Sequence, residues 1–340
     1  MATVLVTGGA GYVGSHVIPG LKRRGHRVVV FDNLDRGHRS TLDQLDVEFV
    51  LGDLNDPEAL QHLFMGYRFD AILHFAALAY VGESMLSPDL YYRVNTAGTL
   101  LLLQQSLAAT ACQPPPVVFS SSCAVFGIPE QLPLDERSPK RPISPYGRSK
   151  LAAEWLLEDF GRAYGLRSVV LRYFNAAGAD LAHGLGELHD PETHLIPLAI
   201  AAVRGDAPLD LFGSDFDTPD GSAIRDFIHV RDLAEAHLLA LDHLLAGGGS
   251  DDFNLGSGSG ISVREVVQAV EAELQSPVPV HHAPCRPGDP AALVSDSRKA
   301  VAVLGWQPHC SSLQQIVADA VAWDQQQRLL ICQELSHVNA

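Results

Sequence analysis

Cysteine is scarce in this chain, with five residues among 340, at positions 112, 123, 285, 310 and 332. Their number is odd, and the sequence contains no C-x-x-C pair and no zinc-ligand spacing. A disulfide framework and a thiolate metal centre are therefore both disfavoured. We expect free thiols, as is usual for a protein of a reducing cytoplasm, and no metal.

Positive charge and long apolar runs are also limited. Lysine and arginine number 24 against 40 acidic residues, which gives a net charge of −16. This balance argues against nucleic acid or an anionic membrane as the main partner, but a few arginines in one pocket could still bind an anionic small molecule. No apolar run approaches the roughly 18 residues of a membrane span, and the apolar N-terminus lacks the basic segment of a secretory signal. We therefore expect neither a leader nor a membrane anchor.

Short apolar runs alternate with helical patterns through the first half of the chain. The runs are "TVLVTG", "RVVVFDN", "LDVEFVLGDL", "AILHFAA", "PVVFSSS" and "SVVLRYFN". Because they are continuously apolar and rich in Val, Ile and Phe, they are typical of parallel strands buried on both faces. The pattern predicts an α/β fold with a Rossmann-type doubly wound parallel sheet, and long helices over about 89–111 and 145–164.

A dinucleotide site is predicted at the first strand. Gly8, Gly11 and Gly14 form a G-x-x-G-x-x-G directly after it and open a helix, as a tight turn around a pyrophosphate requires. Asp32 ends the next strand, where a carboxylate accepts from ribose hydroxyls and repels a 2′-phosphate, so NAD is favoured over NADP. Asp53, after the third strand, suits the adenine end, or alternatively caps a helix.

The segment "SPYGRSK" predicts a helix start with chemistry on one face. Ser144 and Pro145 are typical of the N-cap and first helical position, and Tyr146 and Lys150 stand one turn apart. A phenol has a pKa of about 10, and each unit of lowering requires about 1.4 kcal/mol. Lys150, the helix N-terminus and a nicotinamide ring would all favour the phenolate. Ser122, at the end of "VVFSSS", could orient the same hydroxyl; alternatively the Tyr–Lys pair is an exposed surface pair.

The sequence pattern changes after about residue 176, where the predicted loops become longer. We predict an NAD-binding domain over 1–176, to which a later segment of about 225–256 returns. A smaller, discontinuous α/β substrate domain would occupy mainly 177–340, with the substrate between the two.

Together these motifs resemble the extended short-chain dehydrogenase/reductase family, and within it the sugar-nucleotide 4-epimerases. The resemblance covers nearly the whole chain. Besides the glycine turn and "SPYGRSK", it is carried by "DNL", "GDL", "HFAA", "VGES", "RYFNAAGA", "THLIP", "IRDFIHVRDLAEAH", "NLGSG" and "RPGDP". It implies an epimerase that interconverts UDP-glucose and UDP-galactose by transient oxidation at C4 through a 4-keto intermediate. It also implies a homodimer formed through the helices near 89–111 and 145–164.

The resemblance assigns roles to individual positions. It implies that Tyr146 is the base and acid, Lys150 its partner and Ser122 the third member, and all three would also contact the cofactor. The other implied NAD contacts are Gly8, Gly11, Tyr12, Val13, Gly14, Asp32, Asn33, Leu34, Asp35, Arg36, Gly37, Asp53, Leu54, Phe75, Ala76, Ala77, Ala79, Asn95 and Phe174. Besides Ser122 and Tyr146, the implied UDP-sugar contacts are Asn175, His194, Leu195, Phe212, Arg225, Arg286 and Asp289. Arginines at 225 and 286 could form paired hydrogen bonds with a diphosphate; each alone could equally be a surface ion-pair residue.

Three positions depart from the family pattern. Many members have a threonine at the position of Ala124, and some have a lysine at that of Ala79; both bear on details of binding. Leu293 stands where some members have a tyrosine in the sugar pocket, so an N-acetyl group at C2 could fit.

Other activities remain open at this stage. A 4,6-dehydratase generally carries an acid pair after the serine strand, whereas this chain has Cys123-Ala124-Val125, which disfavours elimination. A UDP-xylose/UDP-arabinose or UDP-N-acetylhexosamine 4-epimerase would need the same groups. A non-catalytic NAD-sensing protein is a further alternative, although such proteins commonly lose the tyrosine or the lysine.

Overall fold

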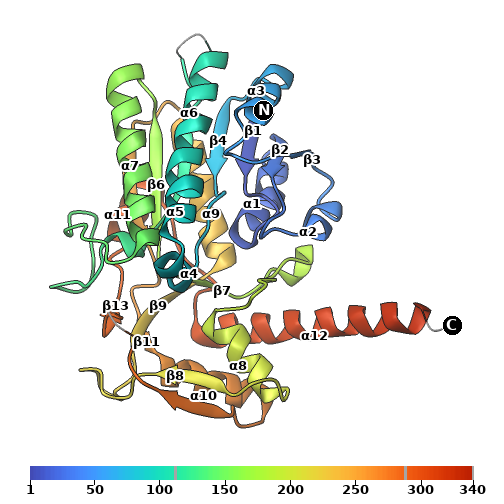
Figure 1. The fold of residues 1–340 in the computed structure, drawn as a ribbon, viewed down its shortest axis with the longest axis vertical. Helices are drawn as coiled ribbons and strands as arrows, with labels where there is room; N and C mark the ends of the chain where they lie inside the picture. The colour runs from blue at the N-terminus through green and yellow to red at the C-terminus, as the bar shows by residue number, and fades with distance from the viewer. Residues whose placement is uncertain (111–112, 287–288, 339–340) are drawn as a thin grey trace.

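A seven-stranded parallel sheet forms the centre of the larger part of the molecule (Figure 1). The computed structural model describes residues 1–110, 113–286 and 289–338, the last eight of them by their main chain alone. The strand order is β10-β6-β5-β4-β1-β2-β3, which confirms the predicted doubly wound sheet. The strands are β1 Thr3–Thr7, β2 Arg27–Asp32, β3 Glu48–Leu51, β4 Ala71–His74, β5 Val117–Ser122, β6 Ser168–Tyr173 and β10 Asp251–Leu255.

Helices cover both faces of this sheet, which explains why its strands are apolar on both sides. One face packs against α1, α9 and α11 through a core that includes Ile18 and Leu241. The other packs against α3, α6 and α7 through a core that includes Leu63 and Leu157. The helices of this larger part are α1 Tyr12–Arg23, α2 Arg39–Asp43, α3 Pro57–Gly66, α4 Val81–Leu86, α5 Pro88–Tyr91, α6 Gly98–Ala109, α7 Pro145–Tyr164, α9 Val230–Leu245 and α11 Arg298–Leu304.

The two long helices predicted from sequence differ in regularity. Helix α7 has the predicted bounds, with the Ser144 side chain accepting from the Gly147 N–H at its N-cap and Pro145 in its first turn. The segment predicted over 89–111 is α5, a π-helical turn η1 over Tyr92–Ala97, and α6 in succession; residue 111 lies outside the described residues. A π-helical turn within a helix is rare and is frequently found at functional sites.

A smaller α/β part lies beyond the carboxyl ends of the central strands (Figure 1). Strand β9 pairs with β7, β11 and β13, and β8 pairs with β12. Helices α8, α10 and α12 pack together in its core through Ile200, Val267 and Ile316. Its elements are β7 Asn175–Ala177, the 3-10 turn η3 Leu181–His183, α8 Leu195–Val203, β8 Leu209–Phe212, β9 Ile224–His229, β11 Gly260–Ser262, α10 Val263–Leu274, β12 Val280–Ala283, β13 Ala292–Leu293 and α12 Leu313–Val338.

The described cysteines are unpaired, and the described helices are unsuited to crossing a membrane. Cys123, Cys285 and Cys310 are free thiols, whereas Cys112 and the side chain of Cys332 lie outside what the structure describes. Among the described residues, every helix is too short or too polar to cross a bilayer.

Candidate active site

The turn between β1 and α1 is shaped to accept a diphosphate. Gly8 has φ +72°, which glycine adopts without strain, and a Cβ on Gly14 would lie 2.2 Å from the Gly8 oxygen. Gly11 forms the N-cap of α1, and no side chain caps that end. The first N–H groups and the positive end of the helix dipole therefore face the turn. This cradle fits the pyrophosphate of the predicted NAD.

Asp32 lies buried at the end of β2 beside this turn. Its two carboxylate oxygens accept from the N–H groups of Ala10 at 3.0 Å and Leu34 at 2.9 Å. Burial raises the pKa of Asp32, and these two hydrogen bonds offset part of that effect. Each oxygen keeps a further lone pair with which to accept from a ribose hydroxyl.

Asp53, the predicted adenine-side acid, is not a helix cap. Helix α3 is capped instead by Asp56, whose side chain accepts from two N–H groups of its first turn. Asp53 accepts from the Asn33 side chain at 2.8 Å and from the Asn55 N–H at 2.7 Å. Burial alone would raise its pKa, but these hydrogen bonds lower it overall. Asp53 thereby holds the loop after β2 against the loop after β3.

Arg36 is fixed by an ion pair that the sequence did not reveal. Its guanidinium donates to Glu83 Oε1 at 2.7 Å and lies over the Tyr80 ring. The other carboxylate oxygen of Glu83 accepts from the Tyr91 hydroxyl at 2.8 Å. The Tyr91 ring in turn packs edge-on against Tyr146, with ring centroids 6.3 Å apart. A chain of contacts therefore links a predicted cofactor residue, Arg36, to the predicted catalytic residue Tyr146.

Asn95, a predicted NAD contact, lies on the π-helical turn η1 and is almost fully buried. Its amide accepts from the Leu78 N–H at 2.8 Å and donates to the Leu78 oxygen at 2.9 Å. It also donates to Ser149 Oγ at 3.0 Å, and the Ser149 hydroxyl donates to the main-chain oxygen of Tyr146 at 2.8 Å. In this structure Asn95 therefore joins the loop after β4 to the first turn of α7.

The remaining predicted cofactor positions lie around the same edge of the sheet. Gly37 packs against Ala10, and a Cβ on Gly8 would strike the main chain of Ala76, so the loops after β1, β2 and β4 are in close contact. Tyr12 donates to the Gly178 oxygen at 2.6 Å. The other predicted positions on these loops and elements are Val13, Asp35, Leu54, Phe75, Ala77, Ala79 and Phe174.

The three serines at the end of β5 have separate partners. Ser120 Oγ is 2.6 Å from the Tyr173 hydroxyl, and Ser121 donates to buried Glu154 at 2.6 Å. Ser122 ends the strand, and its oxygen accepts from the Ala124 N–H at 3.2 Å. Because that bond uses a lone pair, the Ser122 hydroxyl proton is available to donate to a substrate or to Tyr146.

Helix α7 brings Tyr146 and Lys150 to this strand end, and both side chains are buried. A Cβ at position 147 would lie 2.4 Å from the Ala124 oxygen. The glycine, a poor helix former, is thus required where the helix crosses the 3-10 turn η2 over Cys123–Val125. Lys150 Nζ donates to the main-chain oxygen of Ser120 at 2.8 Å and lies 5.0 Å from the centroid of the Phe119 ring.

The electrostatics of this pair differ from the sequence-based expectation of a lowered phenol pKa. Burial raises the pKa of Tyr146, Tyr173 adds to the increase, and a hydrogen bond with Ser122 opposes it. Burial also lowers the pKa of Lys150 to about 7, with Glu154 acting in the opposite direction. Both groups are therefore driven toward their neutral forms by the protein alone, since burial disfavours either charge.

On the substrate side, the structure brings four predicted residues together. Arg225, on β9, donates to Asp289 Oδ1 at 2.6 Å, and Arg286 donates to Asp289 Oδ2 at 2.9 Å. The Arg286 guanidinium lies 4.6 Å from the centroid of the Phe212 ring. Two cations thus share one carboxylate, which orients both arginines toward one region. Leu293 pairs with Arg225 in the sheet and packs against a cluster that contains Phe174.

The other three predicted substrate residues lie at the start of β7 and of α8. Asn175 begins β7, His194 is the N-cap of α8 and Leu195 its first residue. His194 Nδ1 contacts the Glu187 carboxylate. Desolvation opposes the charge on His194, but the Glu187 charge and hydrogen bond raise its pKa overall.

Sequence reasoning missed several residues that organise this site. Glu83 lay unremarked within the block "VGES", and Tyr91 and Ser149 lie one helical turn or less from named residues. Glu187, His189 and Glu192 were assigned only to a long loop. The signal that could have found them is their spacing with His194, E-x-H-x-x-E-x-H, in which every side chain can bind a metal or a proton.

Comparisons with known proteins show which sequences and folds this chain resembles. Residues 4–256 match the family model described as "NAD dependent epimerase/dehydratase family". A UDP-glucose 4-epimerase of Halalkalibacterium halodurans is 46% identical over 321 residues, 94% of this chain and 95% of that protein. The structure of UDP-glucose 4-epimerase from Brucella ovis in complex with NAD has a TM-score of 0.90 and 48% identity, covering 95% of this chain and 98% of that one. The enzyme from Stenotrophomonas maltophila, with NAD and formylated UDP-arabinopyranose bound, has a TM-score of 0.91 and 36% identity, covering 97% and 100%.

Proposed function

Because this chain belongs to the NAD dependent epimerase/dehydratase family, we infer that it is an NAD-dependent UDP-sugar 4-epimerase that interconverts UDP-glucose and UDP-galactose. We further propose that Tyr146, Lys150 and Ser122 carry the chemistry. The observation that supports these roles best is the burial of Tyr146 and Lys150, one helical turn apart, beside the end of β5. A buried phenol and a buried amine are costly to a fold, and their placement at the edge that carries the glycine turn favours a functional reason.

The glycine turn and Asp32 would hold NAD, and the chemistry that it would supply is reversible acceptance of a hydride from C4 of the sugar, with return to the opposite face. Tyr146 would take the proton from the 4-hydroxyl oxygen and later return it to the same oxygen. Ser122 would donate a hydrogen bond from its hydroxyl to that oxygen and so hold it near the phenol. Lys150, fixed by the Ser120 oxygen, would stabilise the phenolate through space. Since burial by the protein disfavours that phenolate, its formation would depend on the positive nicotinamide ring as well as on Lys150.

An epimerase must hold the nucleotide firmly while the 4-keto sugar rotates in the pocket to present its opposite face. Arg225 and Arg286, now joined through Asp289, are suited to bind the diphosphate, which would replace or share the carboxylate. Phe212 lies under the Arg286 guanidinium and would limit its movement. On the sugar side, Ala76 and Ala77 offer few polar groups to fix the ring. Affinity would therefore be concentrated on the part of the substrate that does not react.

Substrate range would be set partly by Leu293. Its side chain packs against the cluster that contains Phe174 and Cys123, and it is smaller than the tyrosine found there in some family members. We propose that the space admits an N-acetyl group at C2.

Three further proposals concern organisation. We propose two domains, with 1–176 and about 225–256 binding NAD and mainly 177–340 binding the UDP-sugar, except that β9, at the start of the returning segment, pairs with strands of the smaller part. We also propose a homodimer that buries the surfaces of α6 and α7, because exposed Trp155 and Tyr164 lie on α7 and exposed aromatic groups are enriched at interfaces. Residence in the cytoplasm accords with the three free thiols.

A coupled assay with no added NAD tests the proposed function. Purified protein would be given UDP-galactose, UDP-arabinose and UDP-N-acetylgalactosamine separately, and the 4-epimer of each would be measured. We expect turnover of UDP-galactose by cofactor that the protein retains through purification. Retained NAD with no turnover of any UDP-sugar would instead identify a cofactor-binding protein without catalysis.

A further inference from the structure

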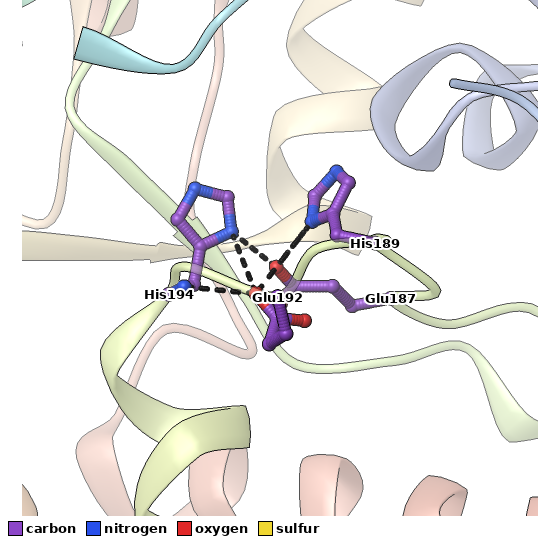
Figure 2. A group of neighbouring side chains, drawn as sticks. All are labelled: Glu187, His189, Glu192 and His194. Carbon is purple, nitrogen blue, oxygen red and sulfur yellow. Dashed lines mark hydrogen bonds and ion pairs between the residues drawn. The ribbon is translucent and has the colours of Figure 1, made fainter. Parts of the chain in front are cut away.

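Four side chains with metal-binding atoms converge in the loop between η3 and α8. Glu187, His189, Glu192 and His194 each offer one ligand atom, and these atoms all lie within 4.8 Å of one another. Figure 2 shows both imidazole rings directed at the two carboxylates, with the four groups meeting at one point. This convergence lies outside the proton-transfer group formed by Tyr146, Lys150 and Ser122, and it shares only His194 with the predicted UDP-sugar contacts.

The spacing of these atoms suits a single ion. His189 Nδ1 lies 2.8 Å from Glu187 Oε1 and 3.9 Å from Glu192 Oε1, and His194 Nδ1 also lies 3.9 Å from Glu192 Oε1. In a tetrahedral zinc site with ligand distances of about 2.0–2.1 Å, neighbouring donor atoms are about 3.3–3.4 Å apart. The observed separations lie on either side of that value, so small rotations of the side chains would bring all four donors around one ion.

The chemistry of the donor set selects a class of ion. Two imidazole nitrogens and two carboxylate oxygens suit zinc and other divalent first-row transition metals, whereas magnesium and calcium prefer oxygen ligands alone. Two carboxylates and two neutral imidazoles also balance the charge of a divalent cation. With four protein donors the coordination would be complete, as in structural zinc sites, and would leave no open position for catalysis.

The loop that carries the donors is held in place from outside. The Trp323 indole N–H donates to the main-chain oxygen of Glu187 at 2.9 Å. Gly186 lies against that indole ring, and a Cβ at this position would be 2.3 Å from it. His38 Nε2 is 2.7 Å from the Leu188 oxygen. The main chain around the donors is therefore positioned by α12 and by the segment before α2, independently of any ion.

The carboxylate of Glu192 is oriented as well. Its Oε1 accepts from the N–H groups of Thr193 at 2.7 Å and His194 at 2.8 Å. Such secondary hydrogen bonds fix the direction of metal ligands in known sites and contribute to affinity. The His194 side chain is 43% exposed, which gives an ion a path from solvent.

We propose that Glu187, His189, Glu192 and His194 form a binding site for one divalent transition-metal ion of the zinc class. The ion would fix the loop that leads into α8. His189 also packs edge-on against Tyr12 and Tyr80, with ring centroids 6.0 and 5.8 Å apart. The site would thus connect the start of α8 to the glycine turn, and its role would be structural.

Metal binding by the full-length protein with its retained NAD tests this proposal. The protein is stripped with a chelator, and ZnCl₂ is titrated in competition with a chromophoric chelator. We expect one Zn²⁺ per chain, and an increase in melting temperature of a few degrees when the ion is in about 100-fold excess over its dissociation constant. Co²⁺ in place of Zn²⁺ should give the visible absorption of a tetrahedral complex.

Two variants identify the ligands. The His189→Gln, Glu192→Gln double variant should lose at least about tenfold in Zn²⁺ affinity; the single Glu192→Gln variant, which changes one atom, serves if the double variant does not fold. His281→Gln is the matched control, because His281 forms an exposed pair with Asp210 at 2.7 Å and should leave Zn²⁺ binding unchanged.

Two results would overturn the proposal. One is the absence of stoichiometric binding of Zn²⁺, Co²⁺ and Mn²⁺, which would identify the cluster as an ion-pair network between histidines and glutamates. The other is unchanged Zn²⁺ affinity in the Glu192→Gln and double variants. Neither readout uses epimerisation, so this inference and the proposed function can fail separately.

Discussion

Lys150 Nζ donates a hydrogen bond to the main-chain oxygen of Ser120, 2.8 Å away, from the first turns of α7 to the end of β5. The bond holds the amine beside the strand whose last residue is Ser122. It also ties helix α7, and with it Tyr146, to the edge of the sheet that carries the glycine turn. The proposed catalytic group is thus built across two elements. Burial disfavours the charged form of both Tyr146 and Lys150.

Replacing Tyr146 with Phe removes the proposed proton carrier and keeps the ring that packs against Tyr91. We expect kcat to fall by at least about 10²–10⁴-fold, with NAD retained at the wild-type ratio. The measurements are the coupled assay with UDP-galactose and quantification of NAD released from denatured protein. The same substitution at Tyr164, which is 47% exposed near the end of the same helix, should change neither quantity. Wild-type activity of Tyr146→Phe would refute the assigned role.

Replacing Lys150 with Met should change how stability depends on pH. The pKa of Lys150 is lowered to about 7 by burial in the folded protein, compared with about 10.4 in an unfolded chain. Between those values the unfolded chain binds more protons, so the contribution of Lys150 to stability is greatest above about pH 10 and is lost as the pH falls toward about 7. The wild-type advantage in unfolding free energy over Lys150→Met should therefore increase as the pH rises through this window.

Urea unfolding at several pH values measures this difference in the protein without substrate. The Lys22→Met variant, altered at a surface lysine paired with Asp46, is the matched control and should keep the wild-type slope. A wild-type advantage that is constant or falls with rising pH would contradict the assigned burial of Lys150.

Replacing Gly147 with Ala should destabilise the protein although alanine is the better helix former by about 1 kcal/mol. The added Cβ would lie 2.4 Å from the Ala124 oxygen, so α7 and the turn after Ser122 would have to separate. We expect a lower melting temperature and a lower kcat, because Tyr146 and Ser122 move apart. Gly66→Ala, at a helical glycine with open space around it, should be neutral or slightly stabilising. Equal effects of the two substitutions would show that the close approach is unimportant.

Replacing Leu293 with Tyr should narrow the substrate range. The larger side chain would occupy the space beside Phe174 that we assign to an N-acetyl group. We expect the ratio of kcat/KM for UDP-N-acetylgalactosamine to that for UDP-galactose to fall at least tenfold, about 1.4 kcal/mol, whereas Leu293→Met should preserve it. Complete rejection of the acetylated substrate by the wild-type protein would end this hypothesis.

The central sheet could be predicted from sequence because its physical signals are local. The runs that became β1, β2, β4, β5 and β6 are mostly apolar, as burial on both faces requires, whereas the edge strand β3 is only partly buried. The start of α7 followed from Ser144 and Pro145, whose capping chemistry acts within one turn. The glycine turn and Asp32 could be predicted equally well, because a dinucleotide-binding motif fixes their spacing along one strand and one helix.

The features that escaped prediction depend on residues far apart in the chain. Buried Arg172 binds Glu154 and also Asp252, a partner 80 residues away. The π-helical turn η1 holds Asn95 against Leu78, which no local pattern requires. The upward shift in the pKa of Tyr146 arises from burial, whereas the sequence displayed only the nearby lysine and the helix N-terminus.

We propose that Tyr146 ionises near neutral pH once the positive cofactor is bound beside it. An ultraviolet difference titration of the NAD-loaded protein, taken as wild type minus Tyr146→Phe, measures phenolate formation at this one residue. We expect a single phenol to titrate near neutrality in the loaded protein, and only well above pH 10 when NAD has been removed, as burial requires. A loaded protein in which Tyr146 stays protonated up to pH 10 would refute this role of the bound cofactor.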